Sequence, residues 1–182
     1  MSLLAIFSQE LARIGGKPHP AESLEQAAAI YADICQEAAS PALRVRWSTS
    51  LLETLDKEAV EITSRDRDEV IRLCAQAQIG LTEADFGIAE TGSLVLESGP
   101  GRSRLASLLP PVHVAVLPLG RMVPSLQAFT ERYAREENAR HLQSMACLTF
   151  ISGPSRTADI EMTLSIGVHG PQALHVILLK DA

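Results

Sequence analysis

Two segments of the chain share a pattern of residues suited to binding a ligand. Leu94–Ser103 and Leu148–Thr157 each begin with an apolar run that stops at Ser-Gly-Pro, and a small residue, an arginine and a hydroxyl residue follow. A short apolar run bounded by glycine and proline is typical of a buried strand. Because ligands bind at the carboxyl ends of strands in an open α/β sheet, we expect both loops to line a site at that edge.

The first loop contains residues that favour an anion. Gly99 and Gly101 permit positive φ angles, so consecutive backbone N–H groups can face one point. Arg102 and Arg104 flank that point, and Ser98 precedes it. These residues form a predicted anion cradle for a carboxylate or phosphate, although the G-x-x-x-x-G-K-[ST] phosphate loop is absent. The alternative is a glycine turn with solvated arginines.

The second loop is expected to line the same edge in a different way. Ser155 or Thr157 can cap a helix, and a helix N-terminus can hold an anion. Asp159 and Glu161 would lie in the first turn, where they oppose a multivalent anion and complement the helix dipole. We therefore expect a capped helix start that suits a neutral or cationic group. The predicted ligand-binding residues of this loop are Ser152, Gly153, Ser155 and Thr157.

Two glutamates near predicted strand ends are candidates for catalysis. Glu90 lies beside Thr91 and Gly92, and Glu97 ends the next apolar run. A buried glutamate can act as a nucleophile or general base. The alternative is that Glu90 hydrogen-bonds its own turn, so that its replacement lowers stability before turnover. Among the histidines, His169 lies in a loop and is the best candidate for a ligand contact, although a structural role is the more common explanation.

The composition argues against several classes of protein. The chain has 182 residues, a net charge of −6 and 4% aromatic residues, which disfavours a general nucleic-acid or anionic-membrane surface. No stretch reaches the ~20 apolar residues of a membrane span, and no signal-peptide pattern begins the chain. Cys35, Cys74 and Cys147 are too few and too far apart for an iron–sulfur or zinc-ribbon site. We expect a soluble cytoplasmic protein with no metal or cofactor of its own.

Helical and extended patterns alternate along the chain. The predicted helices span residues 2–14, 21–38, 50–55, 66–78, 102–109 and 124–135. The predicted strands span residues 43–47, 60–63, 79–82, 86–89, 93–96, 112–117, 145–151 and 174–179.

These elements predict a three-layer α/β/α fold with an open, mostly parallel sheet. Lys17–Pro20 is expected to be a loop. Residues 86–96 are expected to form a hairpin rather than one strand with a bulge. Since no linker is evident, residues 1–182 are expected to form one domain, with a helical part at 1–40 and an α/β core at 41–182.

The middle and end of the chain resemble the LUD family. The likeness is carried by DFGIAETGSLVLESGP at 85–100, LLPPVH at 108–113, SGPSRTADIE at 152–161, GVHGP at 167–171 and LHVILL at 174–179. It covers residues 79–179 and rests on several long motifs in order.

The resemblance implies a fold like that of the NagB, ribose-5-phosphate isomerase and CoA-transferase group. It also implies a role in oxidising L-lactate to pyruvate, as the cluster-free component of a three-protein system. The expected partners are an iron–sulfur protein with cysteine-rich domains and a longer LUD protein with ferredoxin-like clusters. No catalytic residue comes with the resemblance, so its motif positions stand only as the predicted site.

Two functions from different classes are compatible with these residues. In the first, the chain is an accessory subunit that binds iron–sulfur lactate-utilization proteins and shapes their lactate site, with a small anionic metabolite as a candidate ligand. In the second, it is an enzyme of CoA-transferase or sugar-phosphate isomerase type, in which Glu90 or Glu97 acts beside the anion cradle. Turnover by the purified chain alone would distinguish them.

Overall fold

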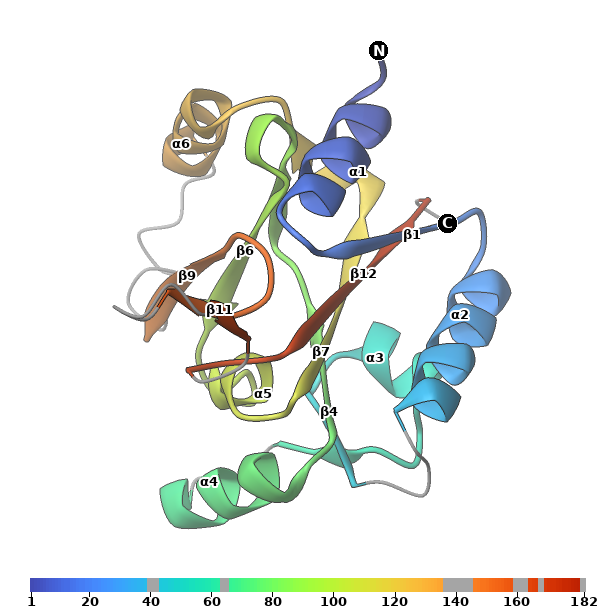
Figure 1. The fold of residues 1–182 in the computed structure, drawn as a ribbon, viewed down its shortest axis with the longest axis vertical. Helices are drawn as coiled ribbons and strands as arrows, with labels where there is room; N and C mark the ends of the chain where they lie inside the picture. Colours follow the sequence, from blue (N-terminus) through green and yellow to red (C-terminus); the bar gives the residue numbers. More distant parts are fainter. Residues whose placement is uncertain (39–42, 63–65, 136–145, 159–163, 167–168, 181–182) are drawn as a thin grey trace.

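A six-stranded sheet, the main sheet, runs through the centre of the protein (Figure 1). The computed structural model describes residues 1–38, 43–62, 66–135, 146–158, 164–166 and 169–180. Within these residues the strand order is β1-β12-β7-β4-β2-β3, and each pair of neighbours is parallel. The strands are β1 (Lys17–Ala21), β12 (Ala173–Leu179), β7 (Val112–Pro118), β4 (Ile79–Glu83), β2 (Arg44–Arg46) and β3 (Val60–Glu61). The predicted α/β class with a mostly parallel sheet is confirmed.

Helices lie on both sides of the main sheet. In Figure 1, α2 (Leu24–Glu37) and α3 (Ser50–Leu55) lie on one side, and α5 (Leu105–Leu108) lies on the other. The central strands read as almost continuous apolar runs because they are covered on both faces. α4 (Arg67–Gln76) begins where predicted, since Asp66 caps it by accepting the Asp68 N–H at 3.0 Å.

A second sheet has the order β8-β5-β6-β9. β5 (Phe86–Ile88) and β6 (Ser93–Ser98) are antiparallel and are joined by the helical turn η1 (Ala89–Thr91), so the predicted hairpin is confirmed. β9 (Cys147–Ile151) pairs antiparallel with β6, and β8 (Met122–Val123) pairs parallel with β5. The second sheet is therefore mixed, unlike the main sheet.

Gly92 lets the hairpin turn approach α1 (Leu3–Arg13). Its φ angle is 62°, in the left-handed region that favours glycine. A Cβ atom at this position would collide with the backbone nitrogen of Leu11. The close approach helps α1 to bury Phe7 and Leu11 completely.

Lys17–Pro20 and Arg156–Ala158 differ in type from the elements expected there. Lys17–Pro20 was predicted to be a loop but belongs to β1, because prolines are tolerated in an edge strand whose outer side needs no ladder hydrogen bonds. Arg156–Ala158 was predicted to begin a helix but forms strand β10, which pairs antiparallel with β11 (Leu164–Ile166). Pairing with β11 satisfies this backbone in place of a helical turn. Asp159 and Glu161 lie outside the described residues.

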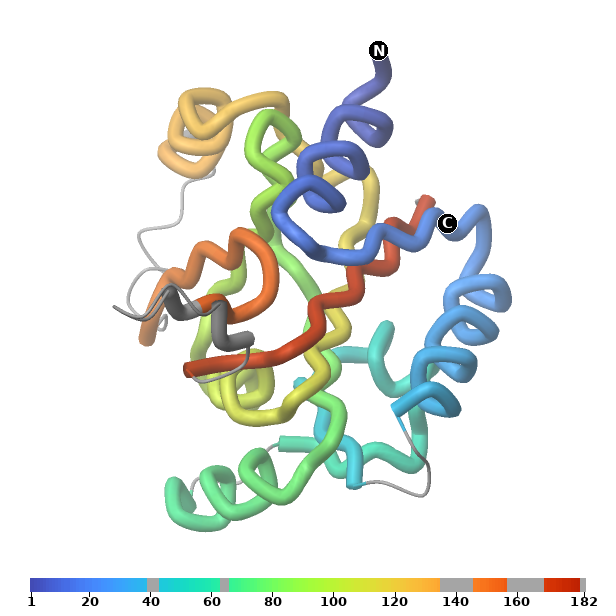
Figure 2. The backbone as a smooth tube through the Cα atoms, in the orientation of Figure 1, coloured from blue at the N-terminus to red at the C-terminus, as the bar shows by residue number. Residues whose placement is uncertain are grey.

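Two strands from opposite halves of the sequence, β1 and β12, lie side by side in the main sheet (Figure 2). β1 pairs with β12 from Lys17 opposite His175 to Ala21 opposite Leu179. The first 40 residues therefore supply a strand as well as helices. The single-domain organisation stays a prediction.

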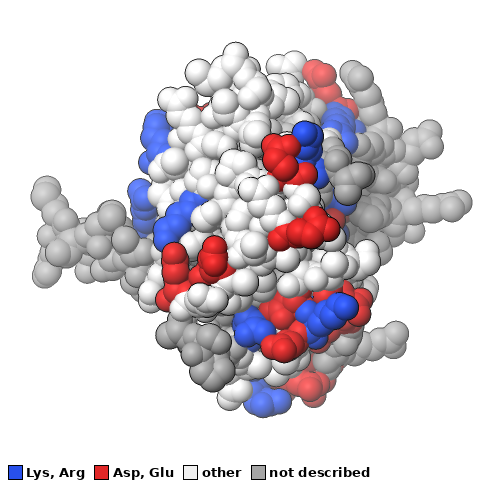
Figure 3. All heavy atoms as spheres, turned by 90° about the vertical axis from the view of Figure 1, so that its right-hand side faces the viewer, with Lys and Arg blue, Asp and Glu red and all other residues white. Residues whose placement is uncertain are grey.

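The surface carries both signs of charge on the side that bears α2. In the view of Figure 3, acidic and basic side chains lie near one another around a wide uncharged area. None of the described helices has both the length and the apolar character needed to cross a bilayer.

α6 (Leu126–Arg135) follows β8 and packs against the second sheet. Its aromatic residue Phe129 meets Phe86 of β5 edge to face, with ring centres 5.1 Å apart. These contacts form a small apolar cluster separate from the main core.

Candidate functional site

The strand order of the main sheet reverses between the neighbouring strands β2 and β4. From β2 the chain moves outward to β3, whereas from β4 it moves through β7 to β12 on the opposite side. In open α/β sheets, the crevice beyond the carboxyl ends of two such strands is the usual ligand site. Here Trp47 follows β2, and Ala84 and Asp85 follow β4. This crevice is therefore the expected place for a ligand.

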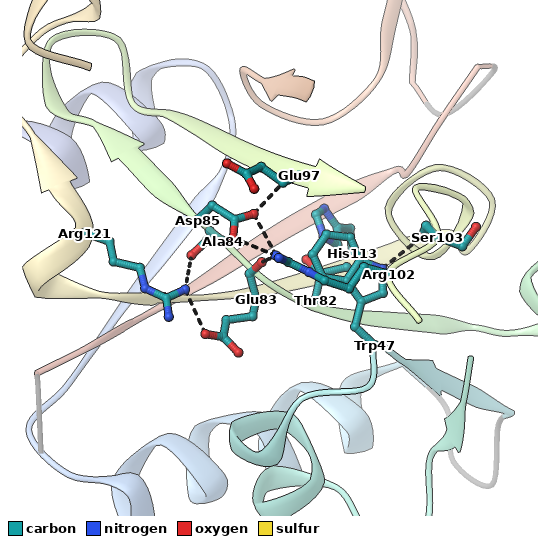
Figure 4. A network of polar contacts seen from close by, with 10 residues as sticks. All are labelled: Trp47, Thr82, Glu83, Ala84, Asp85, Glu97, Arg102, Ser103, His113 and Arg121. Carbon is teal, nitrogen blue, oxygen red and sulfur yellow. Dashed lines mark hydrogen bonds and ion pairs between the residues drawn. The ribbon is translucent and has the colours of Figure 1, made fainter. Parts of the chain in front are cut away.

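Arg102 lies in this crevice between Asp85 and Trp47 (Figure 4). Its Nη2 atom donates to both carboxylate oxygens of Asp85, at 2.8 and 2.7 Å. Its guanidinium carbon lies 4.5 Å from the centre of the Trp47 ring, which is a cation–π contact. The Arg102 side chain is 23% exposed and the Asp85 side chain 14% exposed. The charge of Arg102 is therefore largely compensated within the protein.

A second ion pair adjoins the first. Arg121 Nη1 lies 2.8 Å from Glu83 Oε1 and donates to the Ala84 carbonyl oxygen at 3.1 Å. Asp85 Oδ2 also accepts the backbone N–H of Glu97 at 2.7 Å, which ties β6 to the end of β4. The carboxyl end of β4 thus joins three chain segments through one polar network (Figure 4).

Some residues of this network were not expected from the sequence. Glu83 ends β4 and Asp85 lies two residues beyond it, and their position was a usable signal for a strand end at a ligand edge. Trp47 and Arg121 come from distant segments, and no spacing pattern linked them to Asp85.

His113 is buried on β7 beside the network. Its Nε2 atom lies 2.8 Å from Thr82 Oγ1, and its Nδ1 atom has no hydrogen-bond partner among the described residues. Burial lowers the pKa of His113 to about 3, so the ring is neutral near pH 7. His113 is therefore a buried, neutral residue that contacts Thr82. In the described part of the chain, no group of three or more His, Cys, Asp or Glu side chains is arranged for a metal ion.

A cavity of about 930 Å³, the arginine cavity, lies at the carboxyl ends of β3 and β6. Among the residues that the structure describes, three arginines, Arg67, Arg102 and Arg104, line it, and none of these lining residues is a carboxylate. Gly101, with a φ angle of 71°, accepts the backbone N–H of Ser48 at 3.1 Å and so anchors the loop beyond β2. The residues of the predicted anion cradle that line this cavity are Ser98, Gly99, Gly101, Arg102 and Arg104.

The two Ser-Gly-Pro loops do not share a site, so the prediction of a common edge is wrong. Because β6 and β9 are antiparallel, Ser98 lies opposite Cys147 while Leu94 lies opposite Ile151. The loop after β6 and the loop after β9 therefore leave opposite ends of the same ladder. The second loop lines a separate cavity of about 250 Å³.

This second cavity is lined by four of the seven remaining predicted ligand residues. Ser152, Gly153, Ser155 and His169 line it together with His113. Thr91 reaches Ser152 through a chain of hydroxyl groups, since Thr91 Oγ1 donates to Ser93 Oγ at 2.8 Å and Ser93 Oγ lies 2.6 Å from Ser152 Oγ. Thr157 lies in β10, and Gly92 closes the hairpin turn against α1.

The two candidate glutamates line neither cavity. Glu90 Oε1 accepts the backbone N–H of Leu126 at 2.7 Å, at the first residue of α6. Glu97 is 6% exposed and its carboxylate interacts with Tyr133. Burial, chiefly, and the Glu97 carboxylate raise the pKa of Tyr133 to about 12. Both glutamates therefore contact residues of α6 and help to hold that helix in place.

Replacing Glu90 by alanine should lower the free energy of unfolding by about 1 kcal/mol, since the first N–H of α6 loses its acceptor. Glu90→Gln keeps an acceptor oxygen and should lose less than half of that amount. Urea denaturation of both variants measures the difference. Equal losses in the two variants would mean that the bond to Leu126 does not stabilise the helix.

Comparison with known proteins identifies the relatives of this chain. The LUD domain matches residues 4–179. The chain belongs to the LUD domain family. Lactate utilization protein C of Halalkalibacterium halodurans is 41% identical to this LUD protein over 133 residues, which cover 72% of the chain and 57% of the relative. Lactate utilization protein C of Bacillus subtilis is 37% identical over 114 residues, covering 63% of the chain and 47% of the relative.

The LUD protein spans about half the length of the curated relatives that it matches. It also resembles the crystal structure of a DUF162 family protein from Deinococcus radiodurans, with a TM-score of 0.67 and 20% sequence identity. That likeness covers 97% of this chain and 96% of the other, so the two proteins share a fold along almost their whole lengths.

Proposed function

We propose that this LUD protein acts in L-lactate utilization as a cytoplasmic component that carries no iron–sulfur cluster. The main support is the shared name of its relatives in H. halodurans and B. subtilis, lactate utilization protein C. Oxidation of lactate to pyruvate releases an electron pair, which needs an acceptor. The chain has three cysteines, fewer than the four thiolates that usually hold a cluster, so partner proteins with clusters would take the electrons.

The arginine cavity is the proposed binding site for an anionic metabolite. Arg102 is compensated by Asp85, so it orders the loop, while Arg104 is exposed and available to a ligand. Arg67 supplies a further positive charge from the first turn of α4. Because no carboxylate is found among the described residues that line the cavity, none of those side chains competes with a carboxylate ligand such as lactate or pyruvate.

The alternative role as an enzyme of CoA-transferase or sugar-phosphate isomerase type has less support. It requires a glutamate beside the anion cradle, and neither candidate lines the arginine cavity. Glu90 is engaged with the start of α6.

A growth experiment tests the lactate role. Deleting the gene from its source organism should abolish or strongly slow growth on L-lactate and leave growth on pyruvate normal, since pyruvate lies beyond the proposed step. A plasmid copy should restore growth. Normal growth of the deletion strain on L-lactate would rule out a required role.

A purification experiment tests the partners. The tagged full chain, isolated under mild conditions from lactate-grown cells, should bring down proteins that contain iron and acid-labile sulfide. A tagged chain that restores growth on lactate but isolates no such proteins would contradict the role as a subunit of an iron–sulfur system.

A further inference from the structure

Cys147 occupies a distinctive position in the arginine cavity. It begins β9 directly opposite Ser98 of β6, and both residues line the cavity. Directly opposed side chains in an antiparallel pair lie on one face of the sheet. The Cys147 thiol is partly exposed, so a molecule in the cavity can reach it.

The charge around Cys147 is opposite in sign to that of the whole protein. The chain has a net charge of −6, yet the described residues that line this cavity include three arginines and no carboxylate. Arg104 Nη1 lies 3.9 Å from Cys147 Sγ, and Thr149 Oγ1 lies 3.7 Å from the same sulfur. A positive guanidinium beside the sulfur attracts an anionic reagent to it.

The cavity is suited to a ligand larger than a three-carbon acid. Its volume of about 930 Å³ lies at the upper end of the range for pockets that hold drug-sized molecules. Ser98 is only 5% exposed, and its hydroxyl group has no hydrogen-bond partner among the described residues. A ligand with several polar groups could satisfy such a hydroxyl group, since buried polar groups are normally hydrogen-bonded.

The other two thiols provide an internal comparison. Cys74 is fully buried in the main core, and burial raises its pKa to about 11. Burial also raises the pKa of Cys35. Neither residue lines the arginine cavity. Cys147 is therefore the one of the three cysteines that combines exposure with a cationic cavity.

We propose that Cys147 is a modification site for anionic low-molecular-weight thiols, which react as their disulfides while held in the arginine cavity. The Cys147 thiol loses its proton to solvent, and its sulfur attacks one sulfur of the bound disulfide. The old S–S bond breaks as the new S–S bond to Cys147 forms, and the other half leaves as a thiolate. The exchange conserves electrons, because the oxidising equivalent passes from the small disulfide to the mixed disulfide.

This modification is independent of the lactate role, although it uses the cavity proposed there for a metabolite. A bulky adduct at Cys147 would occupy that cavity and close it to other anions. The exchange is measured on the purified chain without lactate or partners, so its failure would leave the growth and purification tests unaffected.

The test uses oxidised glutathione as the anionic probe and bis(2-hydroxyethyl) disulfide as an uncharged probe. Mass spectrometry of the intact full chain and of its peptides follows the adducts with time. Oxidised glutathione should modify Cys147 at least about 10-fold faster than Cys35 or Cys74. Arg104→Gln should slow the reaction with oxidised glutathione about 3- to 10-fold and change the rate with the uncharged disulfide by less than about twofold.

Two variants control for general effects. Arg72→Gln removes an exposed arginine of α4 that does not line the cavity, and its rates should match those of the unmodified sequence. Cys147→Ser should remove the fast adduct while Cys35 and Cys74 react as before. Equal reaction at all three cysteines, or equal slowing of both probes by Arg104→Gln, would overturn the proposal.

Discussion

Replacing Asp85 by alanine should lower the free energy of unfolding by about 3–5 kcal/mol, which is the usual cost of removing one partner from a largely buried ion pair. The variant leaves the Arg102 guanidinium, which is 23% exposed, without its carboxylate. It also removes the acceptor for the backbone N–H of Glu97. The loss combines an unpaired charge with an unsatisfied backbone donor in β6. Urea denaturation near pH 7 measures it.

An exposed ion pair provides the matched control for Asp85. Lys180 and Glu22 lie 2.8 Å apart, but their side chains are 62% and 74% exposed. Glu22→Ala should therefore lower the free energy of unfolding far less than Asp85→Ala does. If Asp85→Ala costs no more than Glu22→Ala, then Arg102 does not depend on Asp85, and the crevice is not organised by this pair.

The sequence was informative where burial alone determines the local pattern. The runs that became β7 and β12 are nearly continuous apolar stretches, because both of their faces are covered. The predicted cap Asp66 and the hairpin between β5 and β6 follow from short-range rules for helix starts and tight turns. Local chemistry decides each of these features, so a single sequence is enough to predict them.

Strand direction and long-range pairing were not accessible in the same way. An apolar run has the same pattern in a parallel and an antiparallel ladder, so nothing in residues 148–151 indicated that β9 would run antiparallel to β6. β1 contains two prolines, and its strand character depends on the distant edge of β12. These pairings are set by tertiary packing, which the local pattern does not record.

The candidate site was predictable only in part for the same reason. The glycines and arginines after β6 were visible as a possible anion cradle, and they do line one cavity. The contacts that hold Arg102 come from Trp47 after β2 and from Asp85 after β4. The order of strands in the main sheet, rather than any spacing in the sequence, brings these segments together.

Acidification should destabilise the protein below about pH 6.5, well before most carboxylates are protonated. Burial lowers the pKa of His113 to about 3 and, together with Lys17 and His19, lowers that of His175 to about 4. His175 Nδ1 lies 3.1 Å from His19 Nε2, and a pair in which both rings are charged would lose this hydrogen bond. His113 and His175 are therefore both neutral in the folded protein near pH 7.

The sign of the effect follows from proton uptake. An unfolded histidine binds a proton below about pH 6.5, whereas folded His113 does so only near pH 3. Between these values the unfolded state holds more protons, so the free energy of unfolding falls as the pH falls. Above about pH 6.5 the neutral His113 ring costs the folded protein no stability. Between pH 6.5 and pH 3 its effect lowers the free energy of unfolding by an amount on the order of 5 kcal/mol.

A variant that cannot titrate isolates this contribution. His113→Gln keeps a group able to hydrogen-bond Thr82. Its free energy of unfolding should fall less steeply between pH 6.5 and 4 than that of the unmodified sequence, because the share of His113 is removed while that of His175 remains. The slope is informative even if the variant is less stable at every pH. Nitrogen NMR of the imidazole rings gives a second measurement, in which His113 should stay neutral down to pH 5 in the folded protein. A protonated His113 signal at pH 5 would show that burial does not hold the ring neutral, and acid sensitivity would then have to come from the carboxylates instead.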